Sequence, residues 1–168
     1  MATEISLDLI RELRERTGAG VMDCKRALEA AGGDLDQAAA KLAADGIAKA
    51  EKKADRVTAQ GLIDCYIHAG RIGAIVEVNC ETDFVARTQE FRTLAHELAM
   101  QVVASKPLVV SEDQLPEGAE GPPEELVLML QPYIRDPSKN VRQLINETIG
   151  KTGENIQIKR FSRFELGL

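Results

Sequence analysis

Residues 63–80 read IDCYIHAGRIGAIVEVNC, and this stretch decides the class of fold. Apolar side chains occupy every second position on both sides of Ala69-Gly70-Arg71, a period that is typical of β-strands. The alternating apolar positions are Ile63, Cys65 and Ile67 before the interruption and Ile72, Ala74, Val76, Val78 and Cys80 after it. Because the interruption contains glycine and can turn the chain, the stretch predicts a β-hairpin.

The sequence before this hairpin has the periodicity of helices. Ser6 is a candidate cap for the first of three amphipathic helices, and Asp34 is a candidate cap for the third, which is expected to end at Gly46. Three helices of this size predict a compact N-terminal domain over residues 1–46. Residues 47–56 are rich in lysine, alanine and acidic residues and predict a charged helical linker.

The sequence after the hairpin predicts a core and dimerisation domain over residues 57–168. Thr88 is a candidate cap for a long helix that ends before Pro107. All 6 prolines of the chain fall within residues 107–137, where acidic residues are also concentrated. This stretch is therefore expected to be an acidic, proline-rich connector with at most a short helix around residues 124–130.

The end of the chain predicts one more helix and one more strand. Asp136, followed by Pro137 in a first helical turn, is expected to begin a helix that stops at Gly150. Residues 155–166, NIQIKRFSRFEL, alternate again as a strand does. The order of elements predicts an α+β protein, with a three-helix N-terminal bundle followed by a core domain whose small antiparallel sheet packs against helices.

Composition excludes several classes of function. The chain has 168 residues and a net charge of −6, which disfavours a protein held mainly by nucleic-acid phosphates or an anionic membrane. It has no membrane-length apolar run and no export signal pattern, and its 3 cysteines include no CxxC pair. We therefore expect a cytoplasmic protein with reduced thiols, whose partner is a protein or a small molecule.

The residue groupings that catalysis requires are missing from the sequence. His68 and His96 are its only histidines, and it has no metal-ligand spacing, nucleophile elbow or phosphate-binding glycine loop. We therefore expect no enzyme activity, no cofactor and no metal. A thiol site of Cys80, Asp83 and His96 is a further hypothesis, but nothing in their spacing brings them together.

The segment CETDFVAR, residues 80–87, lies between the second strand and the long helix. In one interpretation, Phe84 folds back as a hydrophobic staple for that helix and Asp83 is a local turn or cap residue. In the other, Phe84 is a wedge that fills a pocket of a partner, with the Asp83 carboxylate beside it. The residue pattern alone leaves both interpretations open.

Two other features depart from a plain apolar interior and polar surface. Met22 lies outside the apolar stripe of the second helix, which indicates either a single exposed apolar residue or a contact surface. That stripe consists of Val21, Cys24, Leu28 and Ala31. Lys159, Arg160 and Arg163 surround Phe161 and Phe164, which indicates a solvated strand with two core phenylalanines or, alternatively, a single-strand nucleic-acid platform.

Three blocks of the sequence resemble one known family. They are LRERTGAGVMDCKRALEAAGGDLDQAAAKL, VEVNCETDFVAR, and QPYIRDPSKNVRQL followed by RFSRFELG. The blocks occur in the order of bacterial translation elongation factor Ts and span nearly the whole chain. The chain is therefore identified as resembling the short, single-core form of that family.

The resemblance implies a guanine-nucleotide exchange factor for elongation factor Tu, the GTPase that delivers aminoacyl-tRNA to the ribosome. The helical bundle is similar to ubiquitin-associated domains and, in the family, docks on the GTPase domain. The family's contacts to that domain fall here on Arg14, Val21 and Met22, with Val21 standing where the family often has methionine. The segment that the family uses to displace Mg²⁺ from the partner falls on Thr82, Asp83, Phe84 and Val85.

The resemblance also bears on assembly. Longer members of the family contain two related core subdomains and a coiled-coil insertion, whereas this chain has room for one core unit. We therefore expect a homodimer through the core sheet, with an edge strand of the hairpin or tail as the seam. The alternative function is an adaptor that binds a ubiquitin-like or nascent-chain surface without affecting a nucleotide. No direct binding to nucleic acid and no membrane contact are expected.

Overall fold

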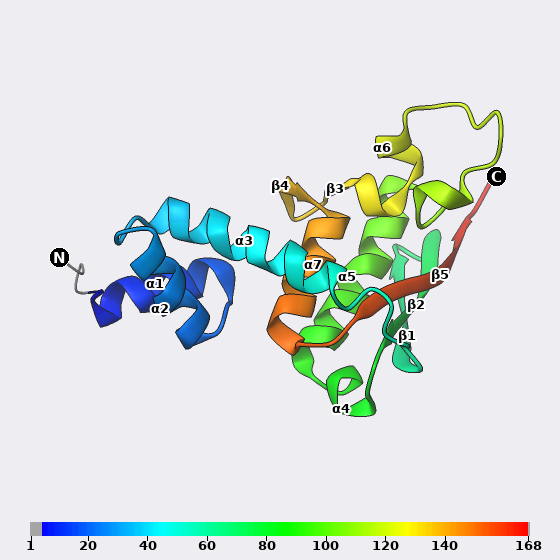
Figure 1. Cartoon of the computed structure of the whole chain (residues 1–168). Helices are drawn as coiled ribbons and strands as arrows, with labels where there is room; N and C mark the ends of the chain where they lie inside the picture. The colour runs from blue at the N-terminus through cyan, green and yellow to red at the C-terminus, as the bar shows by residue number, and fades with distance from the viewer. Residues whose placement is uncertain (1–4, 168) are drawn as a thin grey trace.

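The computed structural model describes residues 5–167, which form an α+β fold as expected (Figure 1). The N-terminal helices are α1 (Leu7–Thr17), α2 (Val21–Ala30) and α3 (Leu35–Glu51). The elements that follow are β1 (Gln60–His68), β2 (Ile72–Cys80), α4 (Asp83–Ala86), α5 (Gln89–Ser105), the 3-10 helix η1 (Glu112–Gln114), α6 (Pro123–Leu126), the 3-10 helix η2 (Leu128–Leu130), β3 (Pro132–Tyr133), β4 (Asp136–Asn140), α7 (Val141–Thr152) and β5 (Ile156–Glu165).

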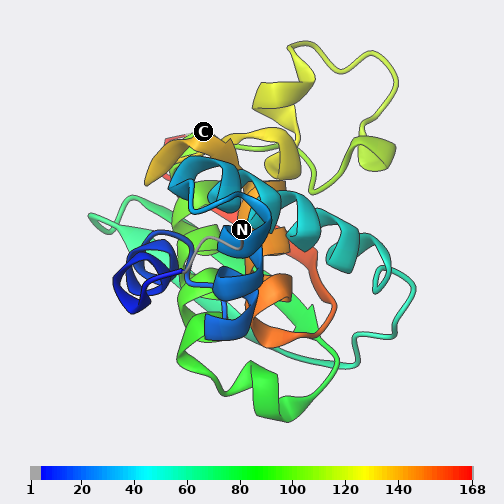
Figure 2. The same cartoon turned by 60° about the vertical axis from the view of Figure 1, so that its left-hand side comes forward.

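The first three helices pack around an apolar cluster of their own, to one side of the rest of the chain (Figures 1 and 2). Their caps are those expected from the sequence: the Ser6 hydroxyl accepts a bond from the Leu9 amide (3.3 Å), and the Asp34 carboxylate accepts one from the Gln37 amide (2.8 Å). The buried side chains of this cluster are Ile10, Leu13, Cys24, Ala27, Leu28 and Ala38.

Helix α3 continues through the position where it was expected to end. Gly46 lies inside the helix, which runs to Glu51, so the prediction of a helix end at Gly46 is wrong. Position 46 faces the backbone of Asn146 in α7, and Ala50 is buried in the larger core of the molecule. These tertiary contacts outweigh the roughly 1 kcal/mol that glycine costs a helix.

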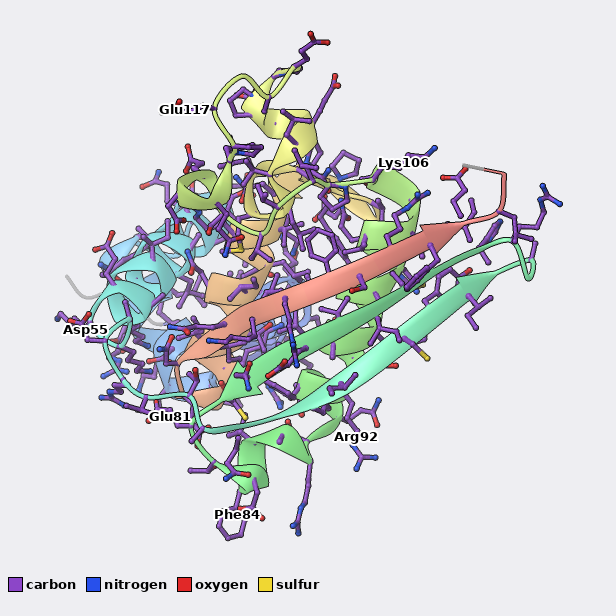
Figure 3. All side chains as sticks on the ribbon, turned by 90° about the vertical axis from the view of Figure 1, so that its right-hand side faces the viewer. Asp55, Glu81, Phe84, Arg92, Lys106 and Glu117 are labelled. Atoms are coloured by element: carbon purple, nitrogen blue, oxygen red, sulfur yellow. The ribbon has the colours of Figure 1, made fainter. Side chains whose placement is uncertain are left out.

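Strands β1, β2 and β5 form an antiparallel sheet with β2 in the centre. The hairpin predicted from the sequence is confirmed, since β1 and β2 pair up to His68 opposite Ile72. Ala69 (φ 51°) and Gly70 (φ 67°) both have the left-handed conformation that a tight hairpin turn requires. Helices α5 and α7 cover one face of the sheet, and the opposite face faces the viewer in Figure 3.

The first strand turns its apolar row away from these helices. Leu62 and Tyr66 pack against the core, whereas Ile63 and Ile67 are 66% and 67% exposed, and Cys65 between them is also exposed. The uncovered face of the sheet is therefore rich in apolar side chains, unlike the solvated face of an ordinary antiparallel sheet.

A register shift in β5 separates the two phenylalanines of the tail. One extra residue, Lys159, lies between the β5 positions that pair with Val78 and Glu77 of β2. Such a bulge changes which face the following side chains occupy. Phe161 packs against the core while Phe164 is 69% exposed on the uncovered face, so the expectation of two core phenylalanines is right for Phe161 only.

Helix α7 begins later than expected, at Val141. Asn140 and Gln143 form a capping box, in which each side chain accepts a bond from the other residue's amide (2.9 and 2.8 Å). Asp136 lies in β4 and accepts bonds from the amide and hydroxyl of Ser138 instead. The prediction of a helix start at Asp136 is therefore wrong, because the capping box fixes the start farther along the chain.

The end of α7 also lies beyond the expected stop. Gly150 is helical, and the helix ends at Thr152. Gly153 follows in the left-handed conformation (φ 78°), and its amide donates to the carbonyl of Ile149. That geometry is a common way to end a helix, so Gly153 and not Gly150 is the stop.

The connector over residues 107–137 contains α6 and η2 near residues 124–130, as expected, but also η1, the short strand β3 and the start of β4, and part of it projects from the core (Figure 2). Its inner end is fixed by two buried amide side chains. Gln101 of α5 donates to Gln131 (3.3 Å), and Gln131 donates to the carbonyls of Glu125 (2.7 Å) and Ser105 (3.1 Å). Apolar side chains of the connector are also buried in the main core, so these bonds and that packing together hold the connector against α5.

Candidate functional site

Phe84 lies on α4, a single helical turn between the end of β2 and the start of α5. Its side chain is 79% exposed and projects outward at the edge of the molecule (Figure 3). The next two residues, Val85 and Ala86, are buried against the core. The turn therefore buries Val85 and Ala86 and leaves Phe84 exposed to solvent. The interpretation of Phe84 as a staple folded into its own core is wrong.

The exposure of Phe84 has an energetic meaning. Burying a phenylalanine side chain contributes roughly 1.5–3 kcal/mol relative to leaving it in water. The chain forgoes that contribution at Phe84, although Phe91 a few residues later is completely buried. An aromatic side chain held in water on an ordered turn is suited to filling a pocket in a partner.

Asp83 lies beside Phe84 on the same turn and is partly exposed. Its carboxylate forms an ion pair with Arg87 (2.8 Å), one turn farther along the chain. Both side chains have large exposed fractions, 47% for Asp83 and 73% for Arg87. Exposed pairs of this kind contribute about 1 kcal/mol or less, so the Asp83 carboxylate can exchange Arg87 for another partner at little cost.

Thr82 differs from these two because its polar groups are used inside the chain. Its hydroxyl accepts a bond from the Val85 amide (3.4 Å) and donates to Glu154 (2.6 Å), and its amide also donates to Glu154 (3.0 Å). Its carbonyl accepts bonds from the Cys80 thiol and the Ala86 amide. Thr82 and buried Val85 therefore hold the turn in place, while Asp83 and Phe84 are presented to solvent.

A second group of exposed side chains lies where α1 and α2 meet. Met22 is 63% exposed and Val21 is 49% exposed, both in the first turn of α2, and Arg14 is exposed in the last turn of α1. The assignment of Val21 to the buried stripe of α2 is wrong, because the buried members of that stripe are Cys24 and Leu28. Two neighbouring apolar side chains are thus available for contact.

The basic residues of the tail are largely engaged within the sheet. Arg160 forms an ion pair with Glu77 (2.7 Å). Arg163 donates to the carbonyl of Val103 (3.2 Å) and pairs with Glu165 (2.7 Å). Because both arginines are paired and Phe161 is packed against the core, this segment does not present the row of cations and stacked rings of a single-strand nucleic-acid platform.

The three residues of the hypothetical thiol site do not form a unit. The Cys80 thiol is buried and donates to the carbonyl of Thr82 (3.1 Å), whereas His96 lies against Asp64 (3.5 Å). Burial, aided by the charge of Glu154, raises the pKa of the Cys80 thiol to about 11. A thiol protonated at neutral pH is a poor nucleophile, so the structure argues against thiol catalysis at Cys80.

This raised pKa gives a prediction for alkylation. Only the thiolate reacts with iodoacetamide, and at pH 8 a pKa of about 11 leaves roughly one Cys80 side chain in a thousand ionised. Native Cys80 should remain unmodified at pH 8 and react only in more alkaline solution, whereas the unfolded chain should react readily. Mass spectrometry of the Cys80 peptide after timed alkylation measures this, and rapid modification of native Cys80 at pH 8 would contradict it.

Neither a metal site nor a membrane span is evident in the part of the chain that the structure describes. Within residues 5–167, no group of three or more His, Cys, Asp or Glu side chains is placed to hold a metal ion. Over the same residues, no helix combines the length and the apolar character needed to cross a bilayer.

Sequence reasoning missed two features of this structure. The first is the uncovered apolar face of the sheet. The alternation in β1 shows that its apolar row and the row with tyrosine and histidine lie on opposite faces, but it does not show which row the helices cover. The second is Glu154, which contacts Thr82 from a loop far away in the sequence. No local pattern marks such a contact.

The fold and these surfaces define a small α+β protein that presents exposed apolar side chains on ordered helical turns. A sequence model of the family described as Elongation factor TS matches residues 36–121. A protein of Thermotoga petrophila named elongation factor Ts is 48% identical over 193 residues, covering 98% of this chain and 97% of the relative. One of Thermoanaerobacter sp. strain X514 with the same name is 47% identical, covering 97% and 95%.

A third relative with that name, from Desulforamulus reducens, is 44% identical over 98% of this chain and 90% of the relative. The chain belongs to the elongation factor Ts family, a family of translation elongation factors. The Thermotoga alignment extends over 193 positions, more than the 168 residues of this chain, so that relative has residues without a counterpart here.

Proposed function

We propose that this chain is a guanine-nucleotide exchange factor that binds elongation factor Tu in its GDP form and promotes release of GDP, so that GTP can replace it. Membership of the elongation factor Ts family supports this function. The observation that carries it is the exposure of Phe84, which is 79% exposed although the next two residues of the same turn are buried. We further propose that the chain acts in the cytoplasm, where translation takes place.

The proposed mechanism uses Phe84 as a wedge. A GTPase holds GDP through its phosphates and through a Mg²⁺ ion that compensates their charge. Phe84 would enter between helices of the partner and shift the elements that organise this ion. Asp83, released from Arg87, would compete for groups that hold the ion and its waters. Loss of this compensation weakens the binding of GDP.

This mechanism places the chemistry in the partner. The exchange factor needs no acid, base or nucleotide pocket of its own, because it changes an equilibrium and breaks no bond. Thermodynamic linkage then requires reciprocity: if the bound factor weakens GDP binding, bound GDP weakens the factor by the same ratio. Rebinding of nucleotide therefore releases the factor.

The N-terminal helices supply a second proposed contact. Arg14, Val21 and Met22 are exposed around the junction of α1 and α2, at a distance from α4 along the molecule (Figure 1). We propose that they dock on the GTPase domain while Thr82–Val85 acts near the nucleotide. The division into an N-terminal domain at residues 1–46, a linker at 47–56 and a core at 57–168 remains a prediction. In this proposal the N-terminal domain binds the partner and the core acts on its nucleotide site.

Substituting Met22 tests the docking surface. Met22→Ala should weaken association with elongation factor Tu by roughly tenfold, mainly through faster dissociation, because removing an interface side chain changes the off-rate more than the on-rate. The fold should be unaffected, since Met22 is 63% exposed. Surface plasmon resonance with immobilised elongation factor Tu gives both rates. An unchanged dissociation rate would remove Met22 from the interface.

We also propose that the chain is a homodimer through the uncovered face of its sheet. The exposed apolar side chains of this face are Ile63, Ile67, Ile75 and Phe164, which span all three strands. A second copy would cover them with an identical patch, as a two-fold interface requires. The strand order leaves β1 and β5 at the edges of the sheet, which supports the proposal that the seam includes an edge strand of the hairpin or tail.

Release of a fluorescent GDP analogue from elongation factor Tu tests the proposed function. Stopped-flow fluorescence should show that this chain accelerates release in proportion to its concentration, up to a plateau. Release that stays at the spontaneous rate at every concentration would overturn the proposal.

A further inference from the structure

We propose that Glu154 is a positioning residue for nucleotide exchange, because its carboxylate fixes the turn that presents Asp83 and Phe84. This inference rests on the proposed function and adds to it a residue outside the Thr82–Val85 segment. Glu154 lies in the loop between α7 and β5, next to the end of β2, because the first residue of β5 pairs with Cys80.

The Glu154 carboxylate accepts three hydrogen bonds from two consecutive residues. One oxygen accepts from the amides of Glu81 (3.1 Å) and Thr82 (3.0 Å), and the other accepts from the Thr82 hydroxyl (2.6 Å). These donors lie directly before α4. A carboxylate that accepts bonds from two backbone amides and a hydroxyl holds them more firmly than neutral acceptors do.

The contact between these two loops is reciprocal. The Glu81 carboxylate accepts a bond from the Asn155 amide (2.7 Å), so each loop supplies a carboxylate to the backbone of the other. The Asn155 side chain, which is buried, donates to the carbonyls of Ala54 (3.2 Å) and Arg56 (2.9 Å) just after α3. The network therefore also joins α4 to the segment that leads from the N-terminal helices.

The effect of Glu154 on Phe84 passes through Thr82. The Thr82 hydroxyl that donates to Glu154 is the same group that accepts from the Val85 amide and caps α4. Phe84 has little packing of its own, so its direction depends on this cap on one side and on buried Val85 and Ala86 on the other. Without Glu154, the Thr82 hydroxyl still caps the Val85 amide, but neither this hydroxyl nor the Thr82 amide is held in place by the carboxylate.

Two substitutions at position 154 separate geometry from charge. Glu154→Ala removes both acceptor oxygens, and with them all three hydrogen bonds, and should lower the maximal rate of GDP release by about tenfold, since small misplacements of an acting group have effects of this order or larger. Glu154→Gln keeps a carbonyl for the two amides and can donate to the Thr82 hydroxyl, so it should restore most of the rate. The chain concentration at half-maximal rate should change less than the maximal rate, because the docking surface on α1 and α2 is intact.

The control variant is Glu117→Ala. Glu117 is an exposed acidic residue of the connector, at the opposite end of the molecule from Phe84 (Figure 3), and its removal changes net charge equally. It should leave the rate unchanged. Thr82→Val provides an independent route, because it removes the hydroxyl that links Glu154 to α4 and should reproduce the Glu154→Ala effect. The double variant should be no slower than the slower single variant, since both interrupt one connection.

A second measurement requires no partner. The chain contains no tryptophan, so Phe84→Trp introduces a unique fluorophore on α4. Time-resolved anisotropy of this introduced indole in the free protein should show faster local rotation when Glu154→Ala is added, and near-original rotation with Glu154→Gln. Circular dichroism and thermal unfolding confirm that the compared chains are folded.

The outcomes are distinguishable. If the unaltered chain fails to accelerate GDP release, the proposed function is wrong, whereas the anisotropy still tests the role of Glu154. If the unaltered chain is active and folded Glu154→Ala and Thr82→Val match it in maximal rate and anisotropy, Glu154 has no positioning role.

Discussion

Phe84→Ala should lower the maximal rate of GDP release from elongation factor Tu by about 30-fold or more. An aromatic side chain that fills a pocket at the centre of an interface typically contributes about 2 kcal/mol or more, and roughly 1.4 kcal/mol corresponds to a factor of ten. The stability of the chain itself should change by less than about 0.5 kcal/mol, because the side chain is 79% exposed. Stopped-flow fluorescence with a GDP analogue measures the rate.

Two further variants show that the effect belongs to this side chain. Leu108→Ala removes an exposed apolar side chain from the connector, outside the proposed contact surfaces, and should leave the rate of release unchanged. Asp83→Ala should also slow release, because it removes the carboxylate proposed to compete for the groups around the ion, and it should leave the fold intact, because only an exposed pair with Arg87 is lost inside the chain. Full activity of folded Phe84→Ala would rule out the wedge.

Ile75→Lys should convert the chain from a dimer to a monomer. Ile75 lies on the uncovered face of the central strand, 49% exposed, with Cys65 and Ser162 opposite it on the two flanking strands. In a two-fold dimer, both copies place the new lysine in the interface. Burying two lysines that lack ion-pair partners costs several kcal/mol of the free energy of association. Analytical ultracentrifugation over a range of concentrations measures the mass.

A matched substitution outside the sheet controls for added charge. Leu108→Lys places the same group at an exposed apolar position of the connector, 53% exposed, and should leave the dimer intact. Cys65 offers an independent readout, because it lies in the proposed interface: it should be protected from alkylation in the dimer and should react in Ile75→Lys. An Ile75→Lys chain that is folded and remains a dimer at every concentration would contradict the proposed interface.

Local signals in the sequence were sufficient for most elements. Ser6, Asp34 and Thr88 cap the helices that they were expected to cap, because a side-chain oxygen can satisfy an amide only three residues away. The hairpin followed from alternation on either side of a turn. These features depend on neighbours in the chain, so the sequence displays them directly.

The wrong end of α3 and the missed apolar face of the sheet arose where distant contacts decide the outcome. Helix α3 passes Gly46 because it packs on α7, and no residue near Gly46 reports that contact. The inward face of β1 is set by its pairing with β2, whose buried row includes Val76 and Val78. Alternation shows that two faces differ, but it does not show which face the helices cover.

The candidate site was only partly predictable for the same reason. The residue pattern identified Phe84 as unusual but could not distinguish a buried staple from an exposed wedge; the structure shows the exposure. The resemblance to the family grouped Thr82 and Val85 with Phe84, whereas the structure separates these anchors from the exposed pair. Glu154 lay outside any motif because it meets Thr82 only in the folded chain.

The most direct test of the account measures binding and GDP release in one sample. Elongation factor Tu loaded with fluorescent GDP is mixed with increasing amounts of the unaltered chain, and complex formation is followed alongside release. We expect a complex whose GDP leaves faster than the spontaneous rate, and whose two proteins separate again in excess GDP, as reciprocity requires. A stable complex in which GDP leaves at the spontaneous rate would contradict exchange and identify the chain as an adaptor.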